Sequence, residues 1–174
     1  MAFIIVGGNV ISFAEYSDVT NTDQRLFEAN EGLSESIVED HLVRATERIL
    51  LMIQQTDWWK TYYIRQSGGN LNPDIYTTNQ IYVPAPEANK IQARQNDFTD
   101  LCVYYALSQL IYPKIADFSV QDSAEQKKIG LFDQKFRQRF QEILDDGAWY
   151  DFNGTGSVTP AERMPVKTNL VRIR

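Results

Sequence analysis

An aromatic stripe with helical spacing, near the C-terminal end of the chain, most constrains what this sequence can fold into. Apolar side chains recur every three or four residues from Ile129 to Ile143, and charged residues fill the positions between them. Side chains at this spacing share one face of an α-helix, so the pattern predicts an amphipathic helix whose aromatic face packs into a core. Ser123 with Gln126 is a capping-box pattern that begins this helix, and Gly147 is placed to end it.

Further helices are indicated by the same periodicity. Ser36 with Glu39 is a second capping-box pattern, and apolar residues recur from Val38 to Met52 at helical spacing. The stretch from Glu87 to Tyr112 is apolar on nearly all sides, which is typical of a helix in the centre of a core, and Pro113 is expected to end or kink it. The predicted helices span residues 21–30, 36–52, 56–66, 87–112 and 123–146.

A dense aromatic cluster falls in the predicted helix 56–66. Trp58 and Trp59 are followed one turn later by Tyr62 and Tyr63. Large aromatic side chains serve both cores and protein interfaces. Packing in the core is the favoured interpretation, and contact with a neighbouring subunit is the alternative.

Turn residues and short β-type runs surround the helices. Residues 3–6 and 10–13 are separated by Gly7, Gly8 and Asn9, which is hairpin chemistry, and such a hairpin must pack on the body or on a neighbouring subunit. The expected fold class is mainly α, a bundle of about three to four helices with short β elements at the N-terminus, in the middle loop and in the C-terminal tail. The predicted organisation is one helical domain over residues 1–162, which includes a hairpin within 1–16 and a Pro/Gly loop arm at 67–88, followed by a basic tail at 163–174.

Composition narrows the class of function. The chain has 174 residues, one cysteine (Cys102) and one histidine (His41), so it has no second thiol or imidazole with which to build a zinc site. It has no phosphate-binding glycine loop and no nucleophile elbow, and the neighbouring Asp145 and Asp146 point apart on a helix, so we do not expect an enzyme. No stretch approaches the roughly 20 apolar residues that span a bilayer, and the start does not resemble a signal peptide, so we expect a cytoplasmic protein without membrane contact.

Charge is distributed unevenly along the chain. The formal net charge of −6 offers no basic face for gripping DNA phosphates, and acidic residues dominate from Glu15 to Glu47. After Glu162 the sign reverses, which suits either docking on an acidic partner surface or a solvated, frayed terminus. The residues predicted to bind a partner are Arg163, Lys167, Leu170, Val171, Arg172, Ile173 and Arg174.

One segment is similar to the twelve-position calcium loop. Asp151 takes the first position, Gly156 the sixth, where the loop turns sharply, and Glu162 the last, which is normally bidentate. Only two of the candidate ligands are carboxylates, so a tight glycine-rich turn whose polar side chains cap the backbone is the alternative. No other cofactor is expected. The candidate calcium ligands are Asp151, Asn153, Thr155, Ser157 and Glu162.

Several segments, in order and spacing, resemble the head–tail connector proteins of tailed bacteriophages, also called adaptor, head-completion or neck proteins. The resemblance covers roughly residues 33 to 174. Its motifs are the acidic start and the helix of residues 33–59, the pieces Tyr104–Leu107 and Ile111–Lys114 of the central helix, the Phe132, Phe136, Phe140 helix running into Trp149–Gly156, and the Arg-rich tail.

This resemblance implies a virion structural protein. Such subunits form a homo-oligomeric ring, commonly of about twelve copies, below the portal and above a tail, stopper or neck protein, and genomic DNA passes through the ring without sequence-specific binding. The resemblance also implies that the tail from Arg163 reaches a neighbouring protein, often the portal. We therefore expect a location at the head–tail junction of the virion, after assembly in the host cytoplasm.

Two other functions remain as alternatives. A calcium-binding protein-interaction module using the loop from Asp151 to Glu162 would change conformation with calcium. A small enzyme with an acidic cleft is the last alternative, and no residue pattern names its substrate.

Overall fold

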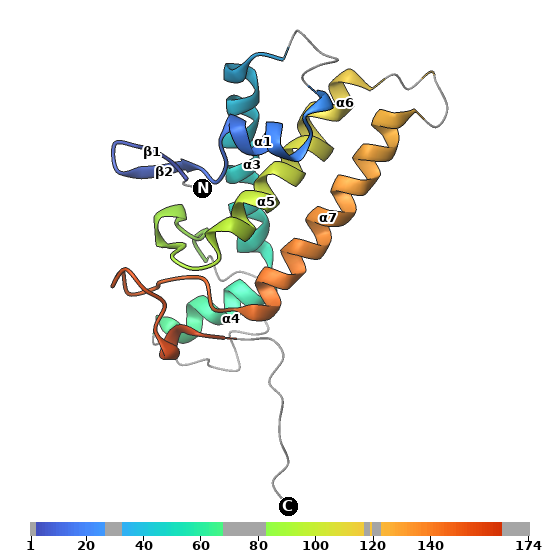
Figure 1. Cartoon of the computed structure of the whole chain (residues 1–174). Coiled ribbons are helices and arrows are strands. Elements are labelled where there is room, and N and C mark those ends of the chain that lie inside the picture. Colours follow the sequence, from blue (N-terminus) through green and yellow to red (C-terminus); the bar gives the residue numbers. More distant parts are fainter. Residues whose placement is uncertain (1–2, 27–32, 68–82, 117–118, 120–122, 165–174) are drawn as a thin grey trace, which may run out of the picture. The chain divides into compact units, whose positions relative to one another are not determined.

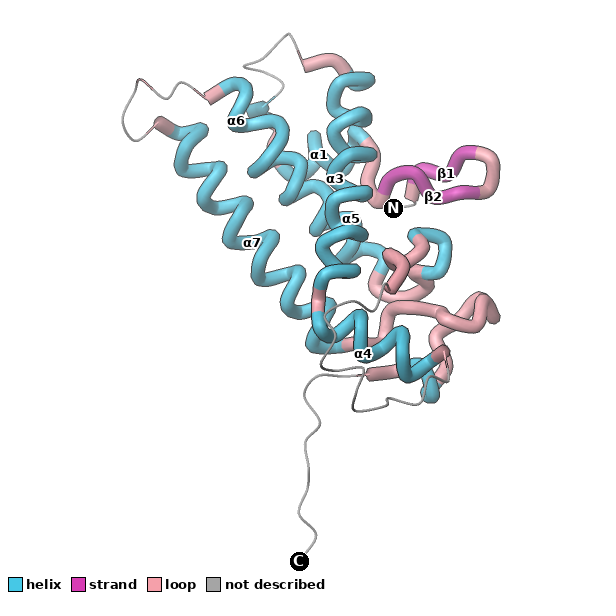
Figure 2. Tube along the Cα trace, turned by 180° about the vertical axis from the view of Figure 1, so that it is seen from behind, coloured by secondary structure: helices cyan, strands magenta, loops and turns pink. Residues whose placement is uncertain are grey.

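The computed structural model describes residues 3–26, 33–67, 83–116, 119 and 123–164 (Figure 1). The chain divides into two compact units, one of residues 1–49 and 94–141 and the other of residues 50–93 and 142–174. The mainly α fold with a small antiparallel sheet at the N-terminus is confirmed (Figure 2). The single helical domain over residues 1–162 stays a prediction, and most of the loop arm at 67–88 lies outside the described residues.

The elements follow the predicted order. Two strands form a hairpin, and helical segments make up most of the remainder of what the structure describes. Among these segments, none is both long and apolar enough to cross a bilayer. The bounds are β1 (Ile4–Val6), β2 (Asn9–Ser12), α1 (Tyr16–Thr22), α3 (Glu35–Gln55), α4 (Asp57–Gln66), η2 (Ala88–Lys90), α5 (Gln95–Tyr105), η3 (Ala106–Ile111), α6 (Tyr112–Ile115), α7 (Ala124–Asp146) and η4 (Pro160–Glu162).

The predicted N-terminal hairpin is present. Strands β1 and β2 pair antiparallel, with Val6 opposite Asn9. The turn between them consists of Gly7 and Gly8, whose φ values of 60° and 85° fall in the left-handed region that favours glycine. The Gly-Gly pair therefore sets both the position of the turn and the register of the strands.

The base of the hairpin is fixed in the core by Phe13. Its backbone N–H donates to Thr46 Oγ1 of α3 at 3.0 Å, and its carbonyl accepts from Thr99 Oγ1 of α5 at 2.7 Å. The Phe13 ring lies 4.9 Å from the Phe3 ring and 5.3 Å from the Phe98 ring. The segment after β2 is thus buried with both of its polar backbone groups satisfied.

The central helix continues through Pro113, where an end or a kink was expected. Segments α5, η3 and α6 follow one another without interruption, and η3 has π-helical geometry. In this segment the Tyr112 N–H donates to the Leu107 carbonyl, five residues earlier. Proline lacks the N–H that an α-helix needs and clashes with the carbonyl four residues before it, so a wider π turn accommodates Pro113.

Helix α7 packs along this central helix through the predicted aromatic stripe. Tyr105 lies 5.2 Å from Phe136 between ring centroids, and Tyr104 and Tyr112 each lie 6.0 Å from Phe132. Phe132 and Phe136 are buried, so the stripe serves the core as predicted. Ser123 caps α7 through its Oγ, which accepts the Gln126 N–H at 3.2 Å, and the predicted end at Gly147 is also confirmed.

Two helix starts were predicted wrongly. The central helix begins at Gln95 and not at Glu87, because Arg94 has a φ of 58° and Ile91 forms a β-bridge with Tyr150. This pairing is remote in sequence and overrides the local helical pattern. Helix α3 begins at Glu35, one residue before the expected cap Ser36, since the carbonyl of Ser34 accepts the Val38 N–H at 3.2 Å.

The helix predicted at residues 21–30 lies partly outside the described residues, and a further short helix that was not predicted precedes it. Helix α1 spans Tyr16–Thr22, and Glu15 and Asp18 form a capping box at its start. Asp23 interrupts the helical backbone, and helical residues resume at Arg25. The start of α1 was not predicted, because its capping box uses two acids in place of the usual Ser or Thr followed by Glu or Gln.

Asp23 belongs to a buried polar cluster with α6 and α7. The Nζ atom of Lys128 lies 2.6 Å from the Asp23 carboxylate and 3.1 Å from the Tyr112 hydroxyl, which itself donates to Asp23. Burial raises the pKa of Asp23, but the hydrogen bonds from Lys128 and Tyr112 outweigh it, so the pKa lies below its usual value. The cluster holds the end of α1 against α6 and α7.

The only histidine of the chain is buried in α3 beside a lysine. His41 is 5% exposed, and its Nε2 lies 3.0 Å from Lys114 Nζ of α6. An ammonium group only donates, so Nε2 accepts and the proton of the neutral ring sits on Nδ1. Burial, followed by the charges of Lys114 and Arg44, lowers the pKa of His41.

Acidification through the imidazole range is therefore expected to destabilise the protein. The unfolded histidine, with a pKa of about 6.5, binds a proton that the folded one resists, so stability is intact above that pH and falls below it. At pH 5.5 the loss reaches at most about 1.4 kcal/mol. Urea unfolding at pH 7.5 and 5.5 measures it. His41→Gln, whose amide oxygen accepts from Lys114 at both pH values, should lose less, and an equal loss would contradict the role of His41.

Candidate functional site: the C-terminal loop and the root of the tail

The C-terminal loop is built on the aromatic cluster of α4. Thr56 begins this helix, as predicted, by accepting the Trp59 N–H at 3.2 Å through its hydroxyl. Trp59 and Tyr62 are buried, and the Trp59 ring lies 4.9 Å from that of Tyr150. Trp149 is also fully buried and lies 5.3 Å from Trp58. Core packing, the favoured interpretation, is thus confirmed for Trp59 and Tyr62, while Trp58 and Tyr63 are half-buried.

The backbone of the segment before the loop is held by hydrogen bonds. The Trp149 carbonyl accepts the N–H groups of Gln92 and Ala93 at 3.2 and 3.3 Å, and the Asp151 N–H donates to the Lys90 carbonyl at 2.8 Å. Tyr62 donates its hydroxyl to the Tyr150 carbonyl at 3.3 Å. These bonds fix where the loop starts.

Asp151 closes the first half of the loop. Its Oδ1 accepts the N–H groups of Gly154 and Thr155 at 2.9 and 3.1 Å, and its Oδ2 accepts that of Gly156 at 2.6 Å. Gly154 and Gly156 have φ values of 70° and 85°, so the backbone can curl around the carboxylate. Burial raises the pKa of Asp151, but the three backbone donors outweigh it and leave the pKa below its usual value.

Glu162 closes the second half. Its Oε1 accepts the Asn153 N–H at 2.9 Å, and its Oε2 accepts both the N–H and the hydroxyl of Thr159, at 2.8 and 2.6 Å. Thr159 and Glu162 form the capping box of η4. Burial raises the pKa of Glu162, but its hydrogen bonds with Thr159 and Asn153 outweigh this effect and lower it. The two buried carboxylates therefore hold the loop from both ends.

The candidate calcium ligands lie in one loop, and its two carboxylates are already engaged by hydrogen bonds. The carboxylates of Asp151 and Glu162 accept hydrogen bonds from the backbone, while Asn153, Thr155 and Ser157 are exposed. Within the described ranges, no three His, Cys, Asp or Glu side chains gather where they could hold a metal. This geometry fits the alternative of backbone capping, and calcium binding stays an untested prediction.

The root of the C-terminal tail is pinned on both of its backbone groups. The Met164 N–H donates to the Gly147 carbonyl at 2.9 Å, and the Met164 carbonyl accepts from Trp58 Nε1 at 2.9 Å. Gln66 donates to the Ala161 carbonyl at 3.0 Å. Sequence reasoning missed Trp58 and Gln66 as anchors, because no local pattern connects α4 with a segment about a hundred residues later.

Of the residues predicted to bind a partner, one lies at this root. Arg163 is exposed immediately before Met164. Lys167, Leu170, Val171, Arg172, Ile173 and Arg174 lie outside the described residues.

Comparisons of the chain with protein-family models, with curated proteins and with solved structures find no match.

Removing either loop carboxylate is expected to destabilise the protein in the absence of any metal. With EDTA present, Asp151→Asn and Glu162→Gln should each cost about 2 kcal/mol, the value of hydrogen bonds between a charged acceptor and buried N–H groups. Chemical denaturation measures the loss, and Glu47→Gln, which changes an exposed carboxylate of α3, is the control.

A calcium site predicts a different pattern. In EDTA the two loop variants would then unfold like the wild type, and calcium would raise the melting temperature of the wild type alone.

Proposed function

We propose that this chain is a structural virion protein, a head–tail connector (adaptor) subunit of a tailed bacteriophage. In this proposal identical copies form a ring below the portal, join head to tail and line the channel through which the DNA passes. The portal lies on one side of the ring and a tail, stopper or neck protein on the other. The resemblance of residues 33–174 to connector proteins motivates the proposal, and the mainly helical fold is compatible with it.

The pinned root of the tail is the observation that supports this proposal most. Met164 is fixed by Gly147 and Trp58, so the ten residues that follow start from a defined point on α4 and the end of α7. Ten residues span at most about 35 Å when extended, which is enough to reach across a neighbouring subunit. A short peptide with a fixed origin loses less entropy on docking than one that starts from a mobile end.

The composition of the tail indicates the chemistry of its partner. Arg163, Lys167, Arg172 and Arg174 give it positive charge with no acid after Glu162, and Leu170, Val171 and Ile173 add apolar side chains. Such a peptide suits an acidic surface with an apolar groove, as in the docking of basic and apolar segments on partner proteins. The acidic remainder of the chain disfavours adhesion to DNA phosphates, which suits a channel that DNA must traverse.

The calcium-dependent interaction module has weaker support, because Asp151 and Glu162 bond to the backbone of their own loop. No contact in the described residues favours a catalytic function, and we do not propose one.

The mass of the protein in solution, measured with and without the candidate portal, tests the proposal. We expect a small species alone and a multi-copy ring on the portal. A chain truncated after Met164 keeps the anchoring contacts of the root, so its melting temperature should match that of the full chain while its binding to the portal is lost.

A charge variant of the tail tests whether its positive charge contributes to binding. Replacing Lys167, Arg172 and Arg174 by glutamine should weaken binding and reduce its salt dependence, whereas the same change at exposed Arg44 and Arg48 of α3 serves as the control. Absence of binding between the full-length protein and the portal at low salt would overturn the proposed function.

A further inference from the structure

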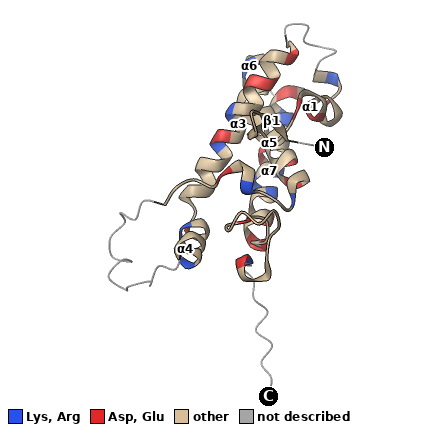
Figure 3. Ribbon diagram, turned by 90° about the vertical axis from the view of Figure 1, so that its left-hand side faces the viewer, with Lys and Arg blue, Asp and Glu red and all other residues tan. Residues whose placement is uncertain are grey.

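The tip of the β1–β2 hairpin is apolar and uncovered. Ile5 is 60% exposed and Val6 59%, and consecutive strand residues point to opposite faces, so neither face of the tip packs on the body. Ile11 on β2 is 37% exposed. The hairpin projects away from the helices in both Figure 1 and Figure 2. From Phe3 to Ala14 the chain carries no charge, and this segment is tan in Figure 3.

Such a tip is costly for an isolated molecule. A two-stranded hairpin is marginally stable in water by itself, and exposed β-branched residues on it are a hazard for association. The hairpin is nevertheless fixed at its base, because Phe13 is buried with its N–H and carbonyl bonded to Thr46 and Thr99. A rigidly held apolar projection has the properties of a docking element.

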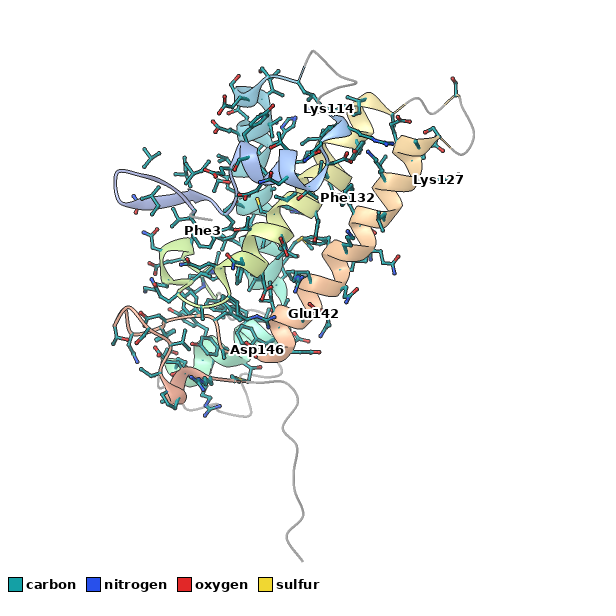
Figure 4. All side chains as sticks on the ribbon, viewed as in Figure 1. Phe3, Lys114, Lys127, Phe132, Glu142 and Asp146 are labelled. Atoms are coloured by element: carbon teal, nitrogen blue, oxygen red, sulfur yellow. The ribbon has the colours of Figure 1, made fainter. Side chains whose placement is uncertain are left out.

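The outer face of α7 has a matching feature. Phe132 faces the core, whereas Lys127 lies on the opposite side of the helix (Figure 4). On this outer face Leu131 is 48% exposed, and the Cβ position of Gly130 meets no atom within 4 Å. A glycine within a helix makes the helix less stable than an alanine would, and no contact in the described residues requires glycine at position 130. Gly130 and Leu131 thus leave a small uncharged patch on the outer face of α7, here called the notch, where nothing prevents the close approach of a partner's backbone.

The hairpin and α7 lie on opposite sides of the same compact unit, with α1 and α5 between them (Figures 1 and 2). Two different patches on opposite sides of a subunit allow head-to-tail contacts, and such contacts close into a ring when the rotation permits. A two-fold dimer would need a patch that is complementary to itself.

Charges around the two patches are also complementary. Lys127 and Lys135 are exposed on α7, where Arg137 is already paired with Asp133 at 2.8 Å, whereas exposed Glu15 follows directly after the neutral hairpin segment. A basic rim around the notch attracts an acidic flank on the incoming hairpin.

We propose that the β1–β2 hairpin of one copy docks on the Gly130–Leu131 notch of α7 in the next copy. This contact rests on the proposed function, because it would form the interface between neighbouring subunits of the proposed ring. It names a second copy of this chain as the partner, with Ile5 and Val6 as the apolar anchors and the basic rim of α7 as the surrounding surface.

Cross-linking between two differently marked proteins tests the contact. One carries Val6→Cys and the other Leu131→Cys, and a short bismaleimide links them only if the two residues of different copies approach. Burial raises the pKa of the native Cys102 thiol to about 12, so this thiol does not compete. The mixture is treated at high concentration and on the portal, and Val6→Cys with Leu51→Cys, which is exposed on α3, is the control pair.

A linked dimer from Val6→Cys and Leu131→Cys, with none from the control pair, is the expected result. Multi-copy rings without that link would overturn the docking contact and leave the proposed function standing. No multi-copy species under either condition would overturn both.

Substitution of Gly130 separates docking from folding. Gly130→Gln fills open space with a better helix former, so the melting temperature should stay the same or rise. The same change blocks the notch, and self-association should weaken about tenfold, the change expected when one apolar anchor is lost. Unchanged assembly by this variant would contradict the notch.

Discussion

The arrangement of α3, α5 and the hairpin depends on how Phe13 is buried. Its ring fills the space between Phe3 and Phe98, and its peptide groups are satisfied by the hydroxyls of Thr46 and Thr99. A buried N–H or carbonyl that loses its partner costs about 1–3 kcal/mol, so β2 cannot slide by one residue without a large loss. Thr46 also lies 3.4 Å from the Cys102 sulfur, which extends the polar contact into α5.

Buried polar groups also fix the backbone at the C-terminal loop and at the root of the tail. Asp151 and Glu162 turn their charges inward to bond the backbone, and Met164 is held by Gly147 and Trp58. At both places a buried polar group fixes the direction of a segment that has little core of its own. Segments fixed in this way need less ordering when they meet a partner, which increases affinity without additional contacts.

Local chemistry made several elements predictable. The start of α4 at Thr56, the cap at Ser123 and the end of α7 at Gly147 depend on hydrogen bonds within one turn of the helix, so the sequence alone could indicate them. The start of α5 was not predictable in this way, because the bridge between Ile91 and Tyr150 joins distant segments. A π-helical turn before Pro113 has no reliable sequence signal either, although the proline itself marks the place where the backbone must adapt.

The candidate site, too, was predictable from the sequence only in part. The sequence brought Asp151 and Glu162 together as residues of one loop, since their spacing resembles a calcium loop. Which atoms their oxygens accept from depends on the curl of the backbone at Gly154 and Gly156, and this is visible only in three dimensions. The anchoring of Met164 by Trp58 depends on the packing of α4 beside the segment after α7, for which the sequence has no periodic or motif signal.

The exposed hairpin tip and Gly130 have a common explanation in the proposed ring. Each reduces the stability of a single copy, the first by leaving Ile5 and Val6 in water and the second by placing glycine within a helix. If the tip covers the notch of a neighbour, the first cost is removed and the contact offsets the second. The net charge of −6 makes separate copies repel one another, so a small apolar contact does not drive assembly by itself. In the proposed assembly, a basic tail bound to an acidic partner would raise the local concentration of subunits until the weak head-to-tail contact is sufficient. We therefore expect the proposed ring to form on its partner and not in free solution.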